Sequence, residues 1–253
     1  VSRMRQDGVL DARIPVFGIV TDFTLHPFWE DTVLDYYVVA NELLVHEARR
    51  KGMDTGKLLP FGIPVKEEFS EEIPASEARA KLNLRDKMTL LVVSSSVGFG
   101  NIPEIVSDID KVPMDFQIVV ICGRNTRLSK KITETHYNKD VIVVGYVDNM
   151  ELYMDAADVI ITKPGGLTVS EALTKRKPLI ITDPIPGVEN RNAYFLINND
   201  LAVYAGKYAR ICDVIMQLHS HPGKIDQMRR AQEVYGKRHS ARMTGDFMID
   251  LIK

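Results

Sequence analysis

Cysteine is scarce in this sequence, and long hydrophobic runs are absent. Of the 253 residues only Cys122 and Cys212 are cysteines, and they lie far apart. Two such cysteines do not suggest a disulfide framework or a metal-binding cysteine cluster, and they favour a reducing compartment. No apolar run approaches the ~18 residues that span a bilayer, and no signal peptide precedes the first expected strand. We therefore expect a cytoplasmic protein that does not cross the membrane.

Basic residues are not in excess, and the usual cofactor motifs are missing. A formal net charge of −2 argues against a nucleic-acid partner, because such proteins usually carry a clear basic excess. The glycine spacing does not match the fingerprint Gly-x-Gly-x-x-Gly, which argues against a nicotinamide enzyme. His219 and His221 stand without a carboxylate or cysteine pattern, so a surface turn explains them better than a metal site does.

What the sequence does contain is a regular alternation of short apolar runs and helical patterns. Near-continuous apolar strands are typical where helices cover both faces of a sheet. The alternation therefore predicts a doubly wound parallel sheet in a Rossmann-like α/β fold. The expected strands are 88–94, 116–122, 141–145, 158–162, 178–182 and 201–204, and the expected helices are 101–110, 125–136, 149–156, 168–175, 189–198, 209–218, 224–235 and 241–252.

A smaller group of elements precedes this alternation. We expect strands over 14–20, 36–40 and 58–61 and a helix over 42–51; the acidic, proline-containing stretch 66–75 then breaks the pattern and reads as an interdomain linker. This organisation divides the chain into residues 1–64, the last part of an N-terminal domain, and residues 65–253, a second domain. Because Val1 leads almost directly into a strand, we also expect that the first part of the N-terminal domain is missing.

Three loops lie where ligands bind in open α/β sheets, outside the carboxyl ends of the strands. The first is Ser94-Ser-Ser-Val-Gly-Phe-Gly100. Its small hydroxyl residues and two glycines, Gly98 among them, would let backbone amides approach a phosphate. A flexible turn accounts for the same residues equally well.

The second loop is Thr162-Lys-Pro-Gly-Gly-Leu-Thr-Val-Ser-Glu171. Gly165 and Gly166 stand just before the expected helix, where free N–H groups and the helix dipole favour an anion. Lys163 adds a positive charge at the same point. The loop therefore predicts a phosphate site.

Glu171 has two interpretations. We place it in the first turn of the helix, close enough to reach a sugar hydroxyl beside the phosphate. However, Thr168 and Glu171 also have the spacing of a capping box, in which the carboxylate only satisfies a backbone N–H. On spacing alone the cap is at least as well supported.

The third loop, Asp183-Pro-Ile-Pro-Gly-Val-Glu-Asn-Arg-Asn192, has two prolines and a glycine that fix a rigid turn. It presents Glu189 and Asn190 at the start of the next helix. These side chains would point to the same crevice, or they would cap that helix.

Together these loops resemble the donor domain of GT-B glycosyltransferases. Their residues are most similar to the corresponding loops of monogalactosyldiacylglycerol synthases and bacterial processive diacylglycerol glucosyltransferases. The lipid-linked muramyl-peptide N-acetylglucosaminyltransferase is related to these enzymes. Besides the second and third loops, the resemblance rests on Thr21-Asp-Phe-Thr-Leu-His-Pro-Phe-Trp29, Phe61-Gly-Ile-Pro-Val65, Cys122-Gly-Arg-Asn125 and Gly145-Tyr-Val147.

The resemblance implies that the second domain binds a UDP-sugar. Glu171 would then hold the ribose hydroxyls, Tyr146 and Val147 would contact uracil, and Glu189 and Asn190 would contact the sugar. The residues implied in donor binding are Gly98, Gly123, Arg124, Tyr146, Val147, Lys163, Gly165, Gly166, Leu167, Thr168, Glu171, Glu189 and Asn190. The family commonly has Gln-Glu after Pro-Gly where this chain has Val188-Glu189, which leaves glucose, galactose and N-acetylglucosamine open.

The implied reaction is an inverting transfer, without a metal or other cofactor, from the UDP-sugar to diacylglycerol or a similar lipid at the inner face of the membrane. The family's general base lies in the missing part, so we expect the chain alone to bind donor and transfer little sugar. His26 and Trp29 would lie near the acceptor or the domain interface, although a packed loop histidine beside an aromatic is an equal alternative. The last helix would cross back to the N-terminal domain.

Other functions stay open at this point. The chain could belong to a GT-B relative with another acceptor, such as a lipid-linked peptidoglycan precursor. A UDP-sugar epimerase would need further acidic and histidine residues in the crevice, and the sequence offers no convincing set. A non-catalytic UDP-sugar sensor would need the donor loops alone. The oligomeric state is open as well.

Overall fold

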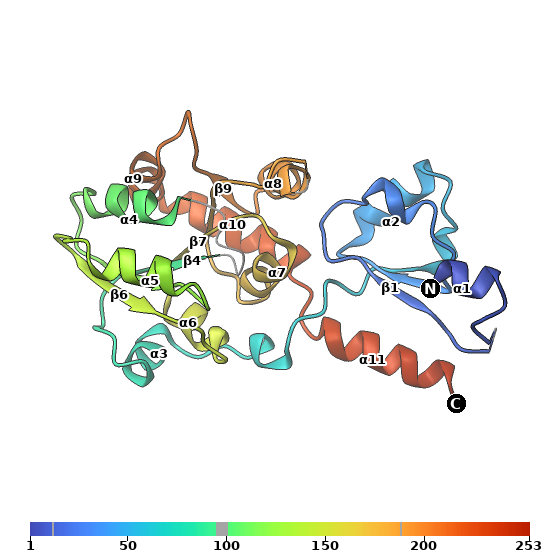
Figure 1. Cartoon of the computed structure of the whole chain (residues 1–253). Helices are drawn as coiled ribbons and strands as arrows, with labels where there is room; N and C mark the ends of the chain where they lie inside the picture. Colours follow the sequence, from blue (N-terminus) through green and yellow to red (C-terminus); the bar gives the residue numbers. More distant parts are fainter. Residues whose placement is uncertain (12, 95–100, 188) are drawn as a thin grey trace.

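The computed structural model describes residues 1–11, 13–94, 101–187 and 189–253, whose strands form two separate parallel sheets (Figure 1). The smaller sheet has the order β1-β2-β3, from β1 (Phe17–Ile19), β2 (Tyr36–Val38) and β3 (Leu58–Leu59). Helices α1 (Ser2–Gln6) and α2 (Glu42–Arg50) accompany it. We call this part the first domain.

The larger sheet has the order β6-β5-β4-β7-β8-β9. Its two central strands are buried at every residue and consist almost wholly of aliphatic side chains, as expected for a sheet covered on both faces. The strands are β4 (Thr89–Val93), β5 (Gln117–Ile121), β6 (Asp140–Val144), β7 (Val159–Thr162), β8 (Leu179–Ile181) and β9 (Val203–Tyr204). The doubly wound sheet predicted from the alternation of elements is confirmed.

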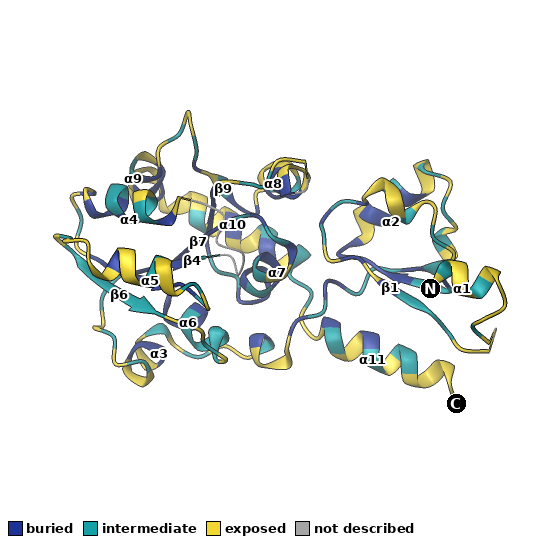
Figure 2. Ribbon diagram, in the orientation of Figure 1, coloured by how far each residue is buried: buried dark blue, intermediate teal, exposed yellow. Residues whose placement is uncertain are grey.

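Helices surround this sheet and turn their buried faces towards it (Figure 2). The chain order of β4, β5 and β6 runs in one direction from the centre and that of β7, β8 and β9 in the other. The sheet therefore has its topological switch point between β4 and β7. The helices of this second domain are α3 (Ala75–Lys81), α4 (Ile102–Asp110), α5 (Thr126–Thr133), α6 (Met150–Ala156), α7 (Gly166–Thr174), α8 (Glu189–Asn198), α9 (Ile211–Ser220) and α10 (Pro222–Tyr235).

The last helix, α11 (Ser240–Leu251), lies against the first domain, far from the six-stranded sheet (Figure 1). The Phe247 ring packs edge-on against Phe17, Tyr36 and Phe61, with ring centroids 6.2, 5.0 and 5.7 Å away. Such edge-to-face contacts are a favoured aromatic geometry. The chain thus crosses between the domains twice, after β3 and before α11.

The two crossings touch each other. The Val65 N–H donates to Ser240 Oγ at 3.3 Å, and the Ser240 hydroxyl donates to the Ile63 carbonyl at 3.0 Å. Ser240 is fully buried, so a single side chain of the returning crossing satisfies two backbone groups of the outgoing one.

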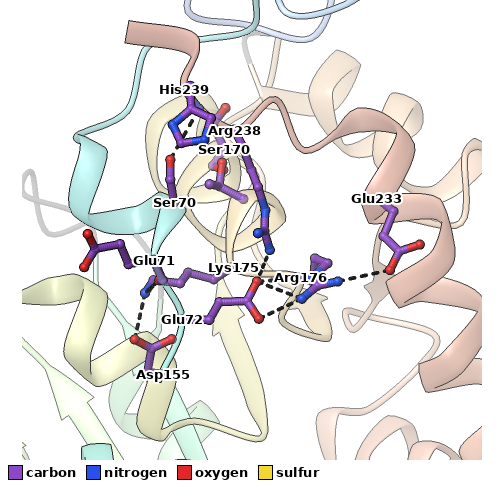
Figure 3. Close-up of polar contacts among 11 residues, drawn as sticks. Ser70, Glu71, Glu72, Asp155, Ser170, Lys175, Arg176, Glu233, Arg238 and His239 are labelled. Carbon is purple, nitrogen blue, oxygen red and sulfur yellow. Dashed lines mark hydrogen bonds and ion pairs between the residues drawn. The ribbon is translucent and has the colours of Figure 1, made fainter. Parts of the chain in front are cut away.

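Charged side chains extend this contact to the C-terminal end of α7 (Figure 3). Glu72, just after the outgoing crossing, binds Arg176 at 2.8 Å and also pairs with Arg238 on the returning crossing. Arg176 in turn binds Glu233 of α10 at 3.1 Å. His239 Nδ1 contacts Glu67. We call Glu67, Glu72, Arg176, Arg238 and His239 the hinge cluster.

The structure corrects two boundaries. The stretch 66–75, predicted as a linker, contains a 3₁₀ turn at Glu67–Ser70 and is followed at once by α3, which was not predicted. Helix α7 begins at Gly166 with Gly165 as its N-cap, two residues before the predicted start at residue 168. Glycine is a poor helix former, and its low propensity hid this start.

Candidate functional site

A cavity of about 850 Å³ opens at the switch point of the large sheet. Val93 and Ser94 at the end of β4 line it, as does Lys163 just after β7. The strands β4 and β7 stay paired to their last residues, but the loops that follow them lead to opposite sides of the sheet, which leaves room for a ligand. Ten of the predicted donor residues line this cavity: Gly123, Arg124, Tyr146, Val147, Lys163, Gly165, Gly166, Leu167, Thr168 and Glu189.

The N-terminus of α7 forms one end of the cavity. The amides of the first helical turn have no intrahelical partner, and the N-cap, Gly165, has no side chain that could accept a hydrogen bond from them. Gly166, Leu167 and Thr168, which carry those amides, all line the cavity. Free N–H groups and the helix dipole together favour an anion at this end.

Lys163 and Glu189 face each other at the same end. The lysine ammonium pairs with Glu189 Oε1, and Glu189 Oε2 accepts the Ile185 N–H at 2.9 Å. The Glu189 side chain is almost completely buried. Both charges therefore lie in the cavity wall, with the carboxylate held by the turn that precedes α8.

The residues that follow β5 and β6 form a second, more apolar end of the cavity. The Arg124 guanidinium lies over the Tyr146 ring, 4.9 Å from its centroid, in a cation–π contact. Val147 and Met150 line the cavity beside them. Gly123, which turns the chain after β5, has a φ of +56°, a conformation that favours glycine. This end suits a planar, partly polar ring.

The first domain covers the end of the cavity at the α7 N-terminus, which we call the anion-binding end. Thr21 and Asp22, in the loop after β1, line the cavity together with Gly166. A Cβ on Gly166 would overlap the Thr21 carbonyl oxygen. The two domains are thus in backbone contact at the helix N-terminus, and glycine is required at 166 for that approach.

Glu171 is placed differently from its prediction. It is the sixth residue of α7, in the second turn, and Thr168 lies inside the helix, so the capping box is wrong. No side-chain hydrogen bond to Glu171 exists within the described ranges. Burial raises the pKa of its carboxyl to about 7; nearby Lys66 lowers it and nearby Glu151 raises it. Glu171 is absent from the cavity lining.

Three further predicted residues, Asn190, His26 and Trp29, also lie off the cavity lining. Gly98 falls outside the described residues. Asn190 is exposed on α8. His26 is exposed and caps a short 3₁₀ turn (Pro27–Trp29) through Nδ1, which accepts the Phe28 N–H at 3.2 Å. Trp29 packs within the first domain, edge-on against Tyr37 at 6.0 Å, so its ring supports the fold of that domain.

Sequence reasoning missed three polar residues of this region: Thr21, Asp22 and Asn192. Asn192 is fully buried between α8 and the first domain. It shares a helical face with Ala193 and Leu196, which are also buried. A polar residue within such an apolar stripe indicates a buried hydrogen-bonding role, and this pattern could have identified it.

Two family models match this chain. Residues 89–235 match the model described as "Glycosyltransferase family 28 C-terminal domain". The chain belongs to glycosyltransferase family 28. Residues 2–65 of this family 28 chain match a second model, described as "Monogalactosyldiacylglycerol (MGDG) synthase". The resemblance expected from the loops is confirmed.

Several curated relatives of this family 28 chain are named processive diacylglycerol beta-glucosyltransferase. The processive diacylglycerol beta-glucosyltransferase of Bacillus licheniformis is 30% identical over 221 residues, which are 86% of this chain and 57% of that protein. The chain therefore spans little more than half the length of that relative.

Solved structures show that this family 28 chain has the GT-B fold. MurG of Acinetobacter baumannii superposes with a TM-score of 0.62 at 16% identity, over 98% of this chain and 68% of that one. Alr3699/HepE of Anabaena, crystallised in complex with UDP, superposes with a TM-score of 0.61 at 13% identity, over 94% and 73%. Of the helices described here, none has the length and apolar character needed to span a bilayer.

Proposed function

We propose that this chain is the donor-binding part of an inverting glycosyltransferase that transfers a hexose from a UDP-sugar to diacylglycerol or a similar lipid. The observation that carries the proposal is the uncapped N-terminus of α7 beside Lys163, at one end of a cavity of about 850 Å³. Small-molecule sites typically measure ~300–1,000 Å³. The relatives' names and the UDP complex of Alr3699/HepE support the same ligand class.

The cavity is arranged for a nucleotide-sugar. The diphosphate would lie at the amides of Gly166 and Leu167, and uracil would lie at the Tyr146 end. Glu189 stands beside the phosphate end, where it would accept a sugar hydroxyl. Glu171 would turn its carboxylate towards the ribose, as the family resemblance implies.

Transfer breaks the bond between the anomeric carbon and the β-phosphate oxygen, so negative charge develops on the departing UDP. The α7 N-terminus and Lys163 stabilise that charge because they are positive and already in place. The acceptor hydroxyl attacks the opposite face of the sugar, which inverts the anomeric centre, and its proton passes to a general base that we place in the part of the relatives that this chain does not span. Since the chain itself supplies the positive charge, we propose that no metal is needed.

The lipid acceptor is proposed from the family alone, together with attachment to the membrane surface. The chain spans 57% of the Bacillus licheniformis relative, and the acceptor half of the site would lie largely in the remainder. We expect transfer by the chain alone to be weak or absent.

Isothermal titration of the chain with UDP, in buffer containing EDTA, tests the proposal. We expect saturable binding of UDP, with ADP and GDP as controls that bind at least tenfold more weakly, a gap of about 1.4 kcal/mol. UDP-glucose, UDP-galactose and UDP-N-acetylglucosamine then identify the sugar. A folded chain that ignores UDP contradicts the proposal, and binding that EDTA abolishes contradicts its metal-free form.

A further inference from the structure

Asn192 of α8 joins the two domains beside the anion-binding end of the cavity. Its Oδ1 accepts the Phe23 N–H at 2.9 Å, and its Nδ2 donates to Asp22 Oδ1 at 2.8 Å and to the Pro164 carbonyl at 3.1 Å. The side chain is 0% exposed, so these bonds are made away from water. The amide therefore uses both of its donor hydrogens and its acceptor.

The partners of Asn192 belong to both sides of the cavity. Asp22 and Phe23 come from the first domain, and Pro164 immediately precedes Gly165 at the start of α7. One side chain thus fixes the loop of the first domain relative to the helix end that would bind phosphate.

Neighbouring residues of α8 contact the same loop. The Phe195 ring stacks on Phe23, with centroids 5.3 Å apart and planes inclined by 14°. The Arg191 guanidinium donates to the Leu25 carbonyl at 3.4 Å. Asn192 lies between these two contacts along the helix, where it supplies the buried, directional bonds.

We propose that Asn192 is a positioning residue that holds the loop Thr21–Phe23 against the α7 end of the cavity, and that the cavity closed in this way binds a nucleoside diphosphate more tightly than one from which the loop has moved away. The identity of the ligand rests on the proposed function. The positioning of the first-domain loop by Asn192 does not, because it rests on the hydrogen bonds described above. Asn192 acts through the loop, because the cavity lining includes Thr21 and Asp22 and omits Asn192.

Linkage gives the proposal a reciprocal form. We call the arrangement with the Thr21–Phe23 loop held against α7 seated, and the one with the loop moved away open. If the seated arrangement binds UDP more tightly than the open one, UDP must favour the seated arrangement by the same factor. Breaking the Asn192 bonds leaves Phe23 N–H, Pro164 C=O and Asp22 without their partner, and such buried groups strongly disfavour the seated arrangement.

The test is an isosteric substitution, Asn192→Asp. Aspartate keeps an acceptor for the Phe23 N–H, loses both donors and faces the Asp22 carboxylate with a like charge. We expect a 5- to 150-fold loss of UDP affinity, the usual range of coupling between two sites. Asn198→Asp, on the exposed end of the same helix, adds the same charge without an interdomain contact and serves as control.

The exchange variant Asp22→Asn/Asn192→Asp separates positioning from direct ligand contact. It restores an amide-to-carboxylate hydrogen bond between the two positions, so we expect it to recover at least half of the loss in log affinity. A residue that touched UDP itself would not be rescued by exchanging its partner. No recovery in a folded exchange variant overturns the proposal.

Interdomain distance is measured in parallel, without ligand. Spin labels at Arg50→Cys on α2 and Arg127→Cys on α5, in a Cys212→Ser background, report the separation of the domains; both positions are exposed. We expect a longer and broader distance distribution for Asn192→Asp and a wild-type distribution for the exchange variant. An unchanged distance distribution for Asn192→Asp overturns the positioning role. Failure of the wild type to bind UDP contradicts the proposed function instead, so the two failures are distinguishable.

Discussion

The Lys163 ammonium and the Glu189 carboxylate form an ion pair in the wall of the donor cavity, at the N-terminus of α7. Because of Glu189, the anion-binding end of the cavity is less positive than the α7 N-terminus and Lys163 alone would make it. Glu189 therefore opposes binding of a bare diphosphate, and its place beside the phosphate suits a sugar hydroxyl.

Removing either charge should change UDP affinity in opposite directions. Glu189→Gln frees Lys163 and should tighten UDP by about 1 kcal/mol, roughly fivefold, while the preference for UDP-sugar over UDP falls. Lys163→Met should weaken UDP by about 1.5–3 kcal/mol. Titration calorimetry measures both, with Lys130→Met on exposed α5 as control. Equal UDP affinity in the wild type, Glu189→Gln and Lys163→Met would show that Lys163 does not contact the phosphate.

The buried Glu171 carboxyl predicts a pH dependence of stability. Its pKa is about 7 in the folded chain against an ordinary 4.5, so between these values the folded chain keeps a proton that the unfolded chain has released. The free energy of unfolding should therefore fall as pH rises from 4.5 to 7, by about 3 kcal/mol for this group, and stay lower above pH 7. Urea unfolding should show a slope over this range that is smaller in Glu171→Gln than in the wild type, and the difference isolates Glu171.

The same carboxyl predicts a pH dependence of UDP binding with the opposite sign. If ribose hydroxyls donate to Glu171, binding selects its ionised form, and affinity should drop by about tenfold per pH unit below 7. The phosphate of UDP also titrates, but it does so equally with Glu171→Gln, so the difference between the two proteins isolates Glu171. Parallel pH profiles would show that this carboxylate does not touch the ribose.

Adjacent glycines should respond unequally to alanine. At Gly166 a methyl group overlaps the Thr21 carbonyl, so the first domain must shift; overpacking of this kind costs about 1–3 kcal/mol. At Gly165 the methyl group would meet Glu189 Oε1 at an ordinary 3.4 Å, and its φ of −76° suits alanine. Interdomain distances should lengthen for Gly166→Ala only. Similar distances in both variants would show that the Thr21 contact does not fix the domains.

Glu72 should hold the hinge cluster together. Burial acts to raise the pKa of Glu72, but the Arg176 hydrogen bond and the charges of Arg176 and Arg238 outweigh it and lower the pKa. Its stabilisation is therefore present above the ordinary pKa and is lost as pH falls below it. Glu72→Gln should cost about 1 kcal/mol at pH 7 and speed tryptic cleavage near the crossings. Glu77→Gln, in an exposed pair on α3, is the control that should leave both unchanged.

The sequence was sufficient for the fold because its main determinants are local. Strands such as β4 and β5 are unbroken runs of aliphatic residues, and helix α8 was predicted at its observed bounds, Glu189–Asn198. Helix α3 was missed because it lies in a polar stretch whose only buried residues are Ala78 and Arg79. Neither residue produces a recognisable apolar stripe.

The site was predictable where one loop supplies the chemistry, as at Lys163, Gly165 and Gly166. It was not predictable where two distant segments meet. The contact of Gly166 with Thr21 joins residues 145 positions apart, and nothing in either local sequence specifies the other. The position of Glu171 depended on where α7 begins, and α7 begins at Gly166, after a glycine N-cap, against the local propensity.

The Ser240 hydroxyl bridges Ile63 and Val65, so the second domain leaves and re-enters the first at almost the same point. Topologically it is an insert whose two ends meet. Such an insert can be exchanged between related chains as one cassette, cut after residue 64 and before residue 240, without stretching the scaffold that receives it. A new donor specificity could be installed in this way, provided that the incoming cassette also carries an asparagine and a glycine that fit the loop at Thr21–Phe23.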